Sequence, residues 1–176
     1  MTGSKPGMLT FIVKDLVTFK TTEIWSMGSY DFGNEWQFGS FGFYTNNPYM
    51  IMIKGENGEQ SFIAIDDLIF RESEFCSTIP STAITDQGLP LPPKPTTTTK
   101  RPSSTDKPPM YDCDFEFGFC NWQNDYTKEM NWTRIRGKTG TDNTGPNFDH
   151  TTGSSLGFYV YIGKILFFDM FIFIKR

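Results

Sequence analysis

The chain has 176 residues, of which 38% are hydrophobic and 16% aromatic, and this composition supports a packed core in one or two domains. With 16 Lys and Arg residues against 20 Asp and Glu residues, the formal net charge is −4. The sequence therefore offers no basic face to neutralise phosphates, and nucleic-acid binding has no electrostatic support. The 3 cysteines are an odd number, so at least one lacks a partner within the chain.

The first part of the chain carries the patterns of β-strands. Apolar residues at odd positions and polar residues at most even positions predict a half-buried strand over 9–19. Two short runs rich in aromatic and β-branched residues, 49–53 and 62–70, flank a turn-forming sequence at 54–58 and predict two further strands. No long stretch shows helical periodicity with caps. Residues 1–79 are therefore expected to be all-β.

Residues 80–109 differ sharply in composition, since they hold eight of the 11 prolines and a run of four threonines. Such a segment cannot build a core, and we expect a disordered or extended linker, partly polyproline II, at about 3.1 Å per residue. Two interpretations stay open. The segment is either a bare spacer or, in a secreted protein, a spacer whose Thr and Ser residues carry O-glycans.

After the linker, the aromatic residues and cysteines of 111–122 predict a strand, 137–153 a loop and 157–163 another strand. Cys113 and Cys120 are separated by six residues, which suits a local disulfide and is too long for the two-residue gap of a zinc knuckle. The alternative is a pair of unpaired buried cysteines in a cytosolic protein.

Short motifs occur in one order along this last part: Cys113-Asp-Phe-Glu116, Cys120-Asn-Trp122, Asn131-Trp-Thr-Arg134, Thr144-Gly-Pro146, Asp149-His-Thr151 and Gly157-Phe-Tyr159. The series resembles the opening half of a MAM domain, an extracellular module named after meprins, neuropilin-type receptors and receptor tyrosine phosphatases. The first part of the chain is similar to the closing half of another copy, through Ile24-Trp25, Gly28, Gly33-Asn-Glu-Trp36 and the run from Ile63 to Leu68 that leads to Cys76.

The resemblance implies jelly-roll-like β-sandwich pieces. Residues 1–79 would be the C-terminal part of one module, 80–109 the linker, and 110–163 the N-terminal part of a second module. Cys113 and Cys120 match the family's first disulfide, and Cys76 matches its final cysteine, whose partner would precede Met1. The chain is then expected to be a piece of a longer protein in which Met1 is not the natural start.

The apolar tail, 164–176, matches no continuation of the module and is left unassigned. It is either translated intron sequence or a genuine apolar segment that dips into a membrane. No run in the sequence reaches the roughly 18 to 20 apolar residues of a membrane-spanning helix, and the chain shows no signal peptide.

The resemblance also implies a structural cation, Ca²⁺ or Na⁺, because MAM domains resemble other jelly-roll modules that bind a hard cation through oxygen ligands. Carried over by position, Glu116 and Asp149 are candidate ligands in the second module, and Asp67 and Asp66 in the first. Because each module would be halved, neither site would be complete within one copy.

Three further features of the sequence concern glycosylation, a histidine and the tryptophans. Asn131 begins an N-glycosylation sequon, which is used only in a chain that enters the secretory pathway. His150 beside Asp149 is interpreted as a structural histidine, since the sequence offers no nucleophile with an orienting base and no pair of converging carboxylates. The four tryptophans are expected to fill the core.

The sequence therefore predicts a non-enzymatic adhesion or recognition fragment, extracellular or part of the ectodomain of a membrane protein. Its partner would be another protein or a homophilic contact on the cell surface, with membrane association through parts of the parent protein outside this sequence. The alternatives are an accessory region of a secreted protease or receptor enzyme, and a structural matrix or mucin-like spacer.

Overall fold

In the computed structural model, the structure describes residues 7–28, 35–56, 58, 62–71, 77–83, 111–128, 130–139 and 145–162, with the backbone of 170–173. This part of the chain contains eight β-strands in two antiparallel sheets and no helix, which confirms the all-β prediction. No helix in the described ranges is therefore long and apolar enough to cross a membrane.

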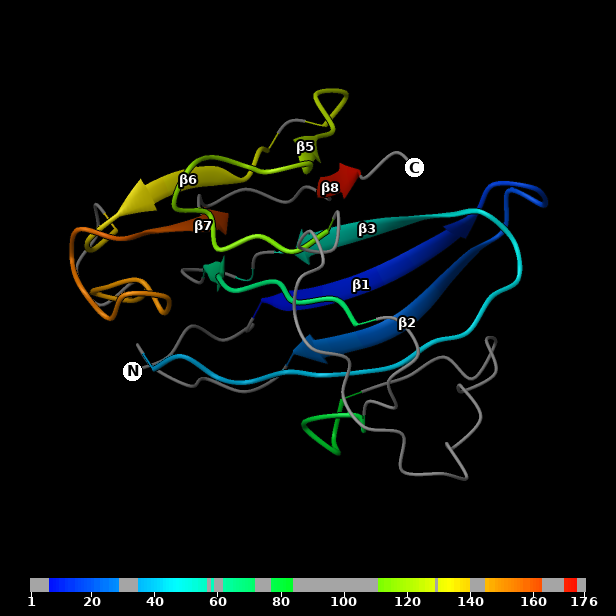
Figure 1. Ribbon diagram of the computed structural model, residues 1–176, viewed down its shortest axis with the longest axis horizontal. Helices are drawn as coiled ribbons and strands as arrows, with labels where there is room; N and C mark the ends of the chain where they lie inside the picture. The colour runs from blue at the N-terminus through cyan, green and yellow to red at the C-terminus, as the bar shows by residue number, and fades with distance from the viewer. Residues whose placement is uncertain are drawn as a thin grey trace, which may run out of the picture.

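The larger sheet has the strand order β2-β1-β3-β8-β5 (Figure 1). Its strands are β1 (Met8–Asp15), β2 (Thr21–Gly28), β3 (Tyr49–Glu56), β8 (Met170–Phe173) and β5 (Gln123–Asn124). β1 pairs with β2 on one side and with β3 on the other, and a bulge at the β1–β2 pair follows Phe11. The first three strands thus come from before the linker, and the last two from after it.

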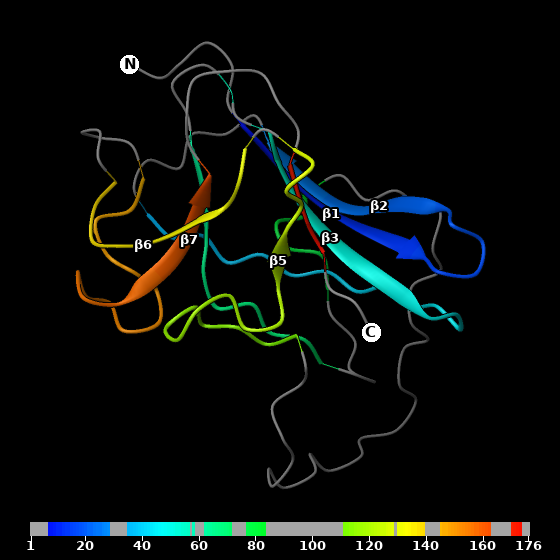
Figure 2. The same cartoon turned by 90° about the horizontal axis from the view of Figure 1, so that it is seen from above.

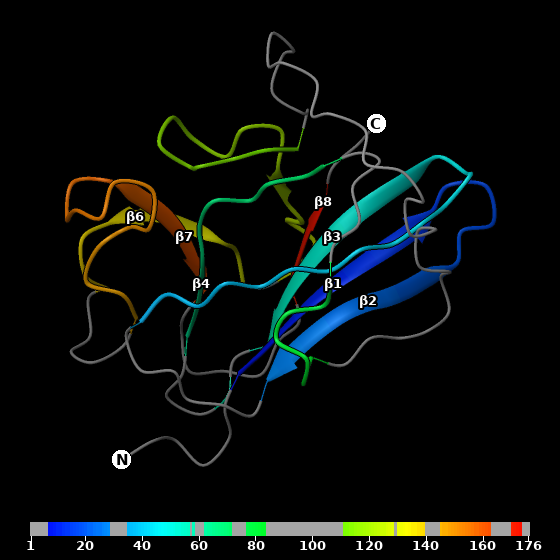
Figure 3. The same cartoon turned by 60° about the horizontal axis from the view of Figure 1, so that its bottom comes forward.

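The smaller sheet has the order β4-β7-β6, with β4 (Ile63–Ile65), β7 (Phe158–Ile162) and β6 (Thr133–Arg136). Figure 3 shows it to the left of β8, β3, β1 and β2, and Figure 2, seen from above, again separates β6 and β7 from β1, β2 and β3. β7 is the central strand, because β4 and β6 both pair with it antiparallel. This sheet too combines segments from both sides of the linker.

One hydrophobic core joins the two sheets. It includes Ile51 and Ile53 of the larger sheet, Val160 and Ile162 of the smaller, all at most 1% exposed. The sheets approach closely at Gly55, where a Cβ would lie 2.8 Å from a methyl carbon of Ile162. There is no room for a side chain at this position, so glycine allows the two sheets to pack closely.

Residues 35–48, which precede β3, cross in front of the larger sheet (Figure 3). The Phe41 ring of this segment lies 4.9 Å from the Phe11 ring and 5.8 Å from that of Trp25. The indole N–H of Trp25 also donates to the carbonyl of Ile79 at 3.2 Å. This bond and the two backbone hydrogen bonds between Ser40 and Ile79 hold the segment 77–83, which includes the first residues of the predicted linker.

Two strand predictions were wrong in extent. β1 ends at Asp15 rather than at residue 19, because the Asp15 carboxylate accepts the backbone N–H groups of Val17 and Thr18 and forms a turn. The middle of β1 is buried on both faces rather than one, with Thr10 at 1% and Ile12 at 6% exposure. A central strand is flanked on each face by the side chains of two neighbours, which explains this burial.

Three other strand predictions were also wrong in part. Only Ile63–Ile65 of 62–70 is a strand, since Asp67 has a positive φ of 50°. Residues 111–122 form turns instead of a strand, because Phe115 and Cys120 have φ values of 57° and 52°. Residues 54–56, predicted as turn, extend β3. The strand predicted at 157–163 is confirmed as β7, and β2 was not anticipated.

The linker prediction concerns residues that lie mostly outside the described ranges. Residues 80–83 alone are described, where Ala83 N–H donates to the carbonyl of Pro80 at 2.9 Å. The tail contributes the backbone of β8, which pairs with β3 and β5. The structure does not test the predicted domain boundaries, and they stay a prediction.

Candidate functional site

A disulfide between Cys113 and Cys120, with Cα atoms 5.8 Å apart, closes the turn-rich loop that begins the second half of the chain. The pairing predicted from sequence is confirmed. Within this loop Phe115 is buried at 1% exposure, whereas Phe117 is 99% exposed. The loop therefore anchors itself in the core by one aromatic ring and presents another to solvent.

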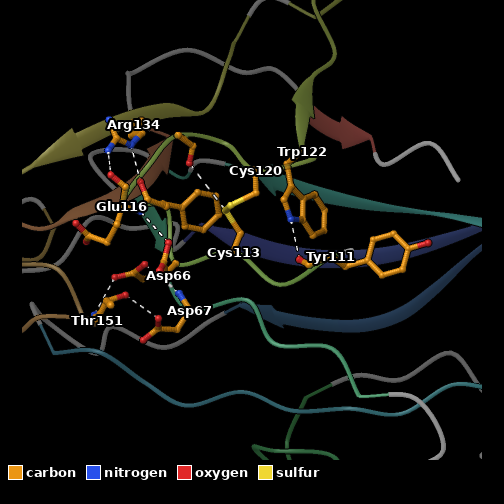
Figure 4. The surroundings of a disulfide bond; sticks show 12 residues. Asp66, Asp67, Tyr111, Cys113, Glu116, Cys120, Trp122, Arg134 and Thr151 are labelled. Carbon is orange, nitrogen blue, oxygen red and sulfur yellow. Dashed lines mark hydrogen bonds between the residues drawn. A yellow bond between two sulfur atoms is a disulfide. The ribbon is translucent and has the colours of Figure 1, made fainter. Parts of the chain in front are cut away.

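Arg134 of β6 holds the loop in place (Figure 4). Its guanidinium donates to the carbonyl of Phe115 at 2.6 Å and to that of Glu116 at 2.5 Å. The same guanidinium stacks over the Phe158 ring, with its carbon 3.4 Å from the ring centroid. A planar guanidinium satisfies two carbonyls and one aromatic face at once, which an ammonium group cannot do. In the sequence Arg134 was only part of a motif, and this role was not predicted.

The side chain of Glu116 connects the loop to β7. One carboxylate oxygen accepts the backbone N–H of Phe158 at 2.8 Å, and the backbone N–H of Glu116 donates to Asp114 at 3.0 Å. Glu116 is thus bound on both its backbone and its side chain. In this arrangement the carboxylate serves to position β7.

Asp149 is fully buried and organises the loop that precedes β7. Its two oxygens accept hydrogen bonds from the backbone N–H of Thr152 at 2.5 Å, the Thr152 hydroxyl at 2.8 Å and the backbone N–H of Ser154 at 3.0 Å. Burial alone would raise the pKa of Asp149, but these hydrogen bonds outweigh it and lower the pKa. A Cβ on Gly157 would overlap the carboxylate, so glycine is required there.

The third group of polar residues joins the end of β4 to the loop at 150–151 (Figure 4). Asp66 accepts the backbone N–H groups of His150 and Thr151 at 2.8 and 3.2 Å. Asp67 accepts the Thr151 hydroxyl at 2.7 Å and lies 2.5 Å from Nδ1 of His150. Burial raises the pKa of Asp66 to about 6, although the hydrogen bonds from His150 and Thr151 oppose this shift.

The predicted cation ligands are therefore each bound to donors of the protein. Among the residues that the structure describes, no group of three or more His, Cys, Asp or Glu side chains could hold a metal ion. The structure carries no test of the cation itself, so Ca²⁺ or Na⁺ binding stays a prediction from the resemblance. Asp66 and Asp67 come from before the linker and Asp149 and Glu116 from after it, yet the fold brings Asp66 and Asp67 to the residues that follow Asp149.

The Asp67–His150 pair has the geometry of an orienting carboxylate with a histidine, and His150 is exposed. The nearby hydroxyl of Thr151, however, donates to Asp67 and not to the imidazole. A nucleophile needs a hydrogen bond to the base that activates it. The arrangement instead ties two segments of the chain together.

The remaining predicted positions have the following places. Asn131 is exposed two residues before β6. Trp25, Trp122 and Trp132 are buried at 5%, 2% and 1% exposure, as predicted for core tryptophans. Trp36 is only partly buried, and its indole N–H donates to the carbonyl of Phe148 at 2.9 Å. Cys76 lies outside the described residues.

The disulfide-closed loop, the Arg134 contacts and the two sheets define an all-β module with a local disulfide. Residues 113–165 match the family described as MAM domain, meprin/A5/mu. Over this segment the chain is similar to the MAM domain family. This match does not extend to residues 1–79, so the predicted partial copy there stays a prediction.

Relatives are similar to the chain over short regions only. "MAM domain-containing protein 2" of Homo sapiens is 44% identical over 62 residues, which are 34% of this chain and 9% of that protein. "Thyroid hormone-induced protein B" of Xenopus laevis is 44% identical over 50 residues, 28% of this chain and 7% of that protein. The chain thus spans less than a tenth of the length of these relatives. No solved structure matches the chain.

Proposed function

We propose that the chain is a non-catalytic recognition module of a longer extracellular protein. The observation that carries the proposal is the MAM segment closed by the Cys113–Cys120 disulfide, since disulfides persist in oxidising compartments outside the cytosol. The named relatives are described by their MAM domain or by their induction, and none of their names states an enzymatic activity.

Among the described residues, Phe117 is the most exposed of the large hydrophobic side chains. Phe117 is 99% exposed on a loop held by the disulfide and by Arg134. An aromatic side chain on a rigid loop loses little conformational entropy on binding, and such residues are enriched among those that dominate interface energetics. We therefore place the recognition surface around the tip of this loop, and the partner is a protein at the cell surface.

The test is a binding assay with beads that carry the oxidised, folded chain and with cultured cells. Beads with the wild-type chain should bind cells, and Phe117→Ser should reduce binding strongly without changing stability. Leu156→Ser is the matched control, because Leu156 is also exposed, at 73%, but lies outside the disulfide loop. If wild-type beads bind no better than uncoated beads, or if the two variants behave alike, the proposal is wrong.

A further inference from the structure

The segments on the two sides of the linker share both sheets. In the smaller sheet, β4 comes from before the linker and forms three residue pairs with β7, from Ile63 opposite Ile162 to Ile65 opposite Val160. In the larger sheet, β3 pairs with β8 over four residues. Without the first segment, residues 7–71, the central strand β7 would keep only β6 as a neighbour.

Polar contacts hold the residues that follow β4 against the second segment, residues 111–162. On one side Leu68 and Cys113 exchange two backbone hydrogen bonds of 2.9 Å. Asp112 then accepts the backbone N–H of Phe70 at 2.6 Å and pairs with Arg71 at 2.9 Å. The contacts of Asp66 and Asp67 with the loop at 150–151 also join the two segments. Backbone hydrogen bonds and ion pairs require defined partners, so they make the contact between the two segments specific.

The apolar contact between the segments is buried to the degree of a protein interior. Trp132 and Ile162, both 1% exposed, lie against Gly55 of β3. The Phe70 ring packs 5.6 Å from that of Tyr111, and the Trp36 ring packs 5.6 Å from that of Tyr159. Either segment alone would expose these rings and aliphatic side chains to water, which favours association strongly.

The contacts above join residues of the first segment directly to residues of the second, and 39 residues, 72–110, separate the two segments along the chain. A tether raises the local concentration of one binding partner at the other, to the order of millimolar for a short flexible linker, but adds no contact. We propose that residues 111–162 together with β8 form a binding surface for residues 7–71 of the same chain that works without a covalent connection. The two segments then complement each other as a separable pair, and the linker acts only as a tether.

The experiment uses the full chain with a site for a sequence-specific protease placed within 84–110, folded under oxidising conditions and then cut. The two pieces should elute together with the 20.2 kDa mass of the uncut chain. They should also unfold in a single transition, and its midpoint should fall on dilution once the chain is cut. Cut wild-type pieces that separate, or that unfold in two transitions, would overturn the proposal.

Two variants with the same substitution locate the interface. Ile65 is 7% exposed and paired with Val160, so Ile65→Asp should separate the cut pieces. Ile69 lies in the same segment but is 61% exposed, so Ile69→Asp should leave them together. If uncut Ile65→Asp does not fold, Ile65→Ala should weaken the cut complex by about thirtyfold. An uncut chain that is a dimer would overturn the assignment, because the first segment of a second copy would then occupy the surface.

Discussion

Replacing Gly157 by alanine tests the most constrained position of the structure. A Cβ at this position would overlap the carboxylate of Asp149, which is fully buried and accepts three hydrogen bonds from Thr152 and Ser154. The methyl group therefore cannot be accommodated unless the carboxylate moves. Because this carboxylate organises the loop that leads into β7, the movement should destabilise the whole smaller sheet.

The magnitude follows from two costs and one gain. Overpacking a filled site costs about 1–3 kcal/mol, and loss of one hydrogen bond to a buried charged group costs about 1.5–3 kcal/mol. Alanine also restricts the unfolded chain, which raises the free energy of unfolding by about 0.4–1 kcal/mol. The free energy of unfolding of Gly157→Ala should therefore fall by about 3 kcal/mol, a large part of the stability of a small domain.

Urea unfolding followed by tryptophan fluorescence measures this change, since Trp122 and Trp132 are both buried. Gly153→Ala is the control. Gly153 has a φ of 63°, but no heavy atom lies within 4 Å of where its Cβ would be. Only backbone strain of about 1–2 kcal/mol is therefore expected. In the Asp149→Ala background, the further cost of Gly157→Ala should largely disappear. Equal losses for the two glycine variants, or no loss for Gly157→Ala, would refute the reasoning.

Four further outcomes are expected. The pKa of Asp15 is lowered from 3.8 to about 2, chiefly by the hydrogen bond from Asn47. The contribution of Asp15 to stability is therefore present above pH 3.8 and lost as the pH falls toward 2. Acid unfolding of Asp15→Asn should lack this component. Gly55→Ala should lower the free energy of unfolding by about 1–3 kcal/mol in urea titrations, because the methyl group would meet Ile162. Secretion from eukaryotic cells should add an enzymatically removable N-glycan at Asn131, detected as a mass shift that Asn131→Gln abolishes; an unchanged wild-type mass would contradict this. Calorimetric titration with Ca²⁺ should show weak binding or none, since the candidate carboxylates are already engaged by protein donors, and micromolar affinity would contradict this.

Local patterns in the sequence predicted what depends on neighbouring residues. The spacing of Cys113 and Cys120 indicated the disulfide, and the aromatic and β-branched runs indicated the all-β class and the strands β3 and β7. The ends of the strands were less predictable. A carboxylate that bonds to nearby backbone, as Asp15 does, or a residue with positive φ, as at Asp67, stops a strand without changing its hydrophobic pattern.

The candidate site was only partly predictable for the same reason. Resemblance pointed to Asp66, Asp67, Glu116 and Asp149, and the structure gives each of them a hydrogen-bonded role. The resemblance did not reveal that donors of the protein already occupy these carboxylates. Arg134 was not singled out, because its partners are two backbone carbonyls, which carry no sequence signal.

The sequence by itself determined the class of fold, the disulfide and the MAM resemblance of the second half, because alternation, cysteine spacing and motif order are properties of the chain. Only the tertiary structure decided that the two sides of the linker share both sheets. It also decided that Asp66 meets His150 across a separation of 84 residues, and that Gly157 must lack a side chain. The physical reason is that such contacts depend on strand register and on close packing of a common core, and neither is encoded in any single stretch of sequence.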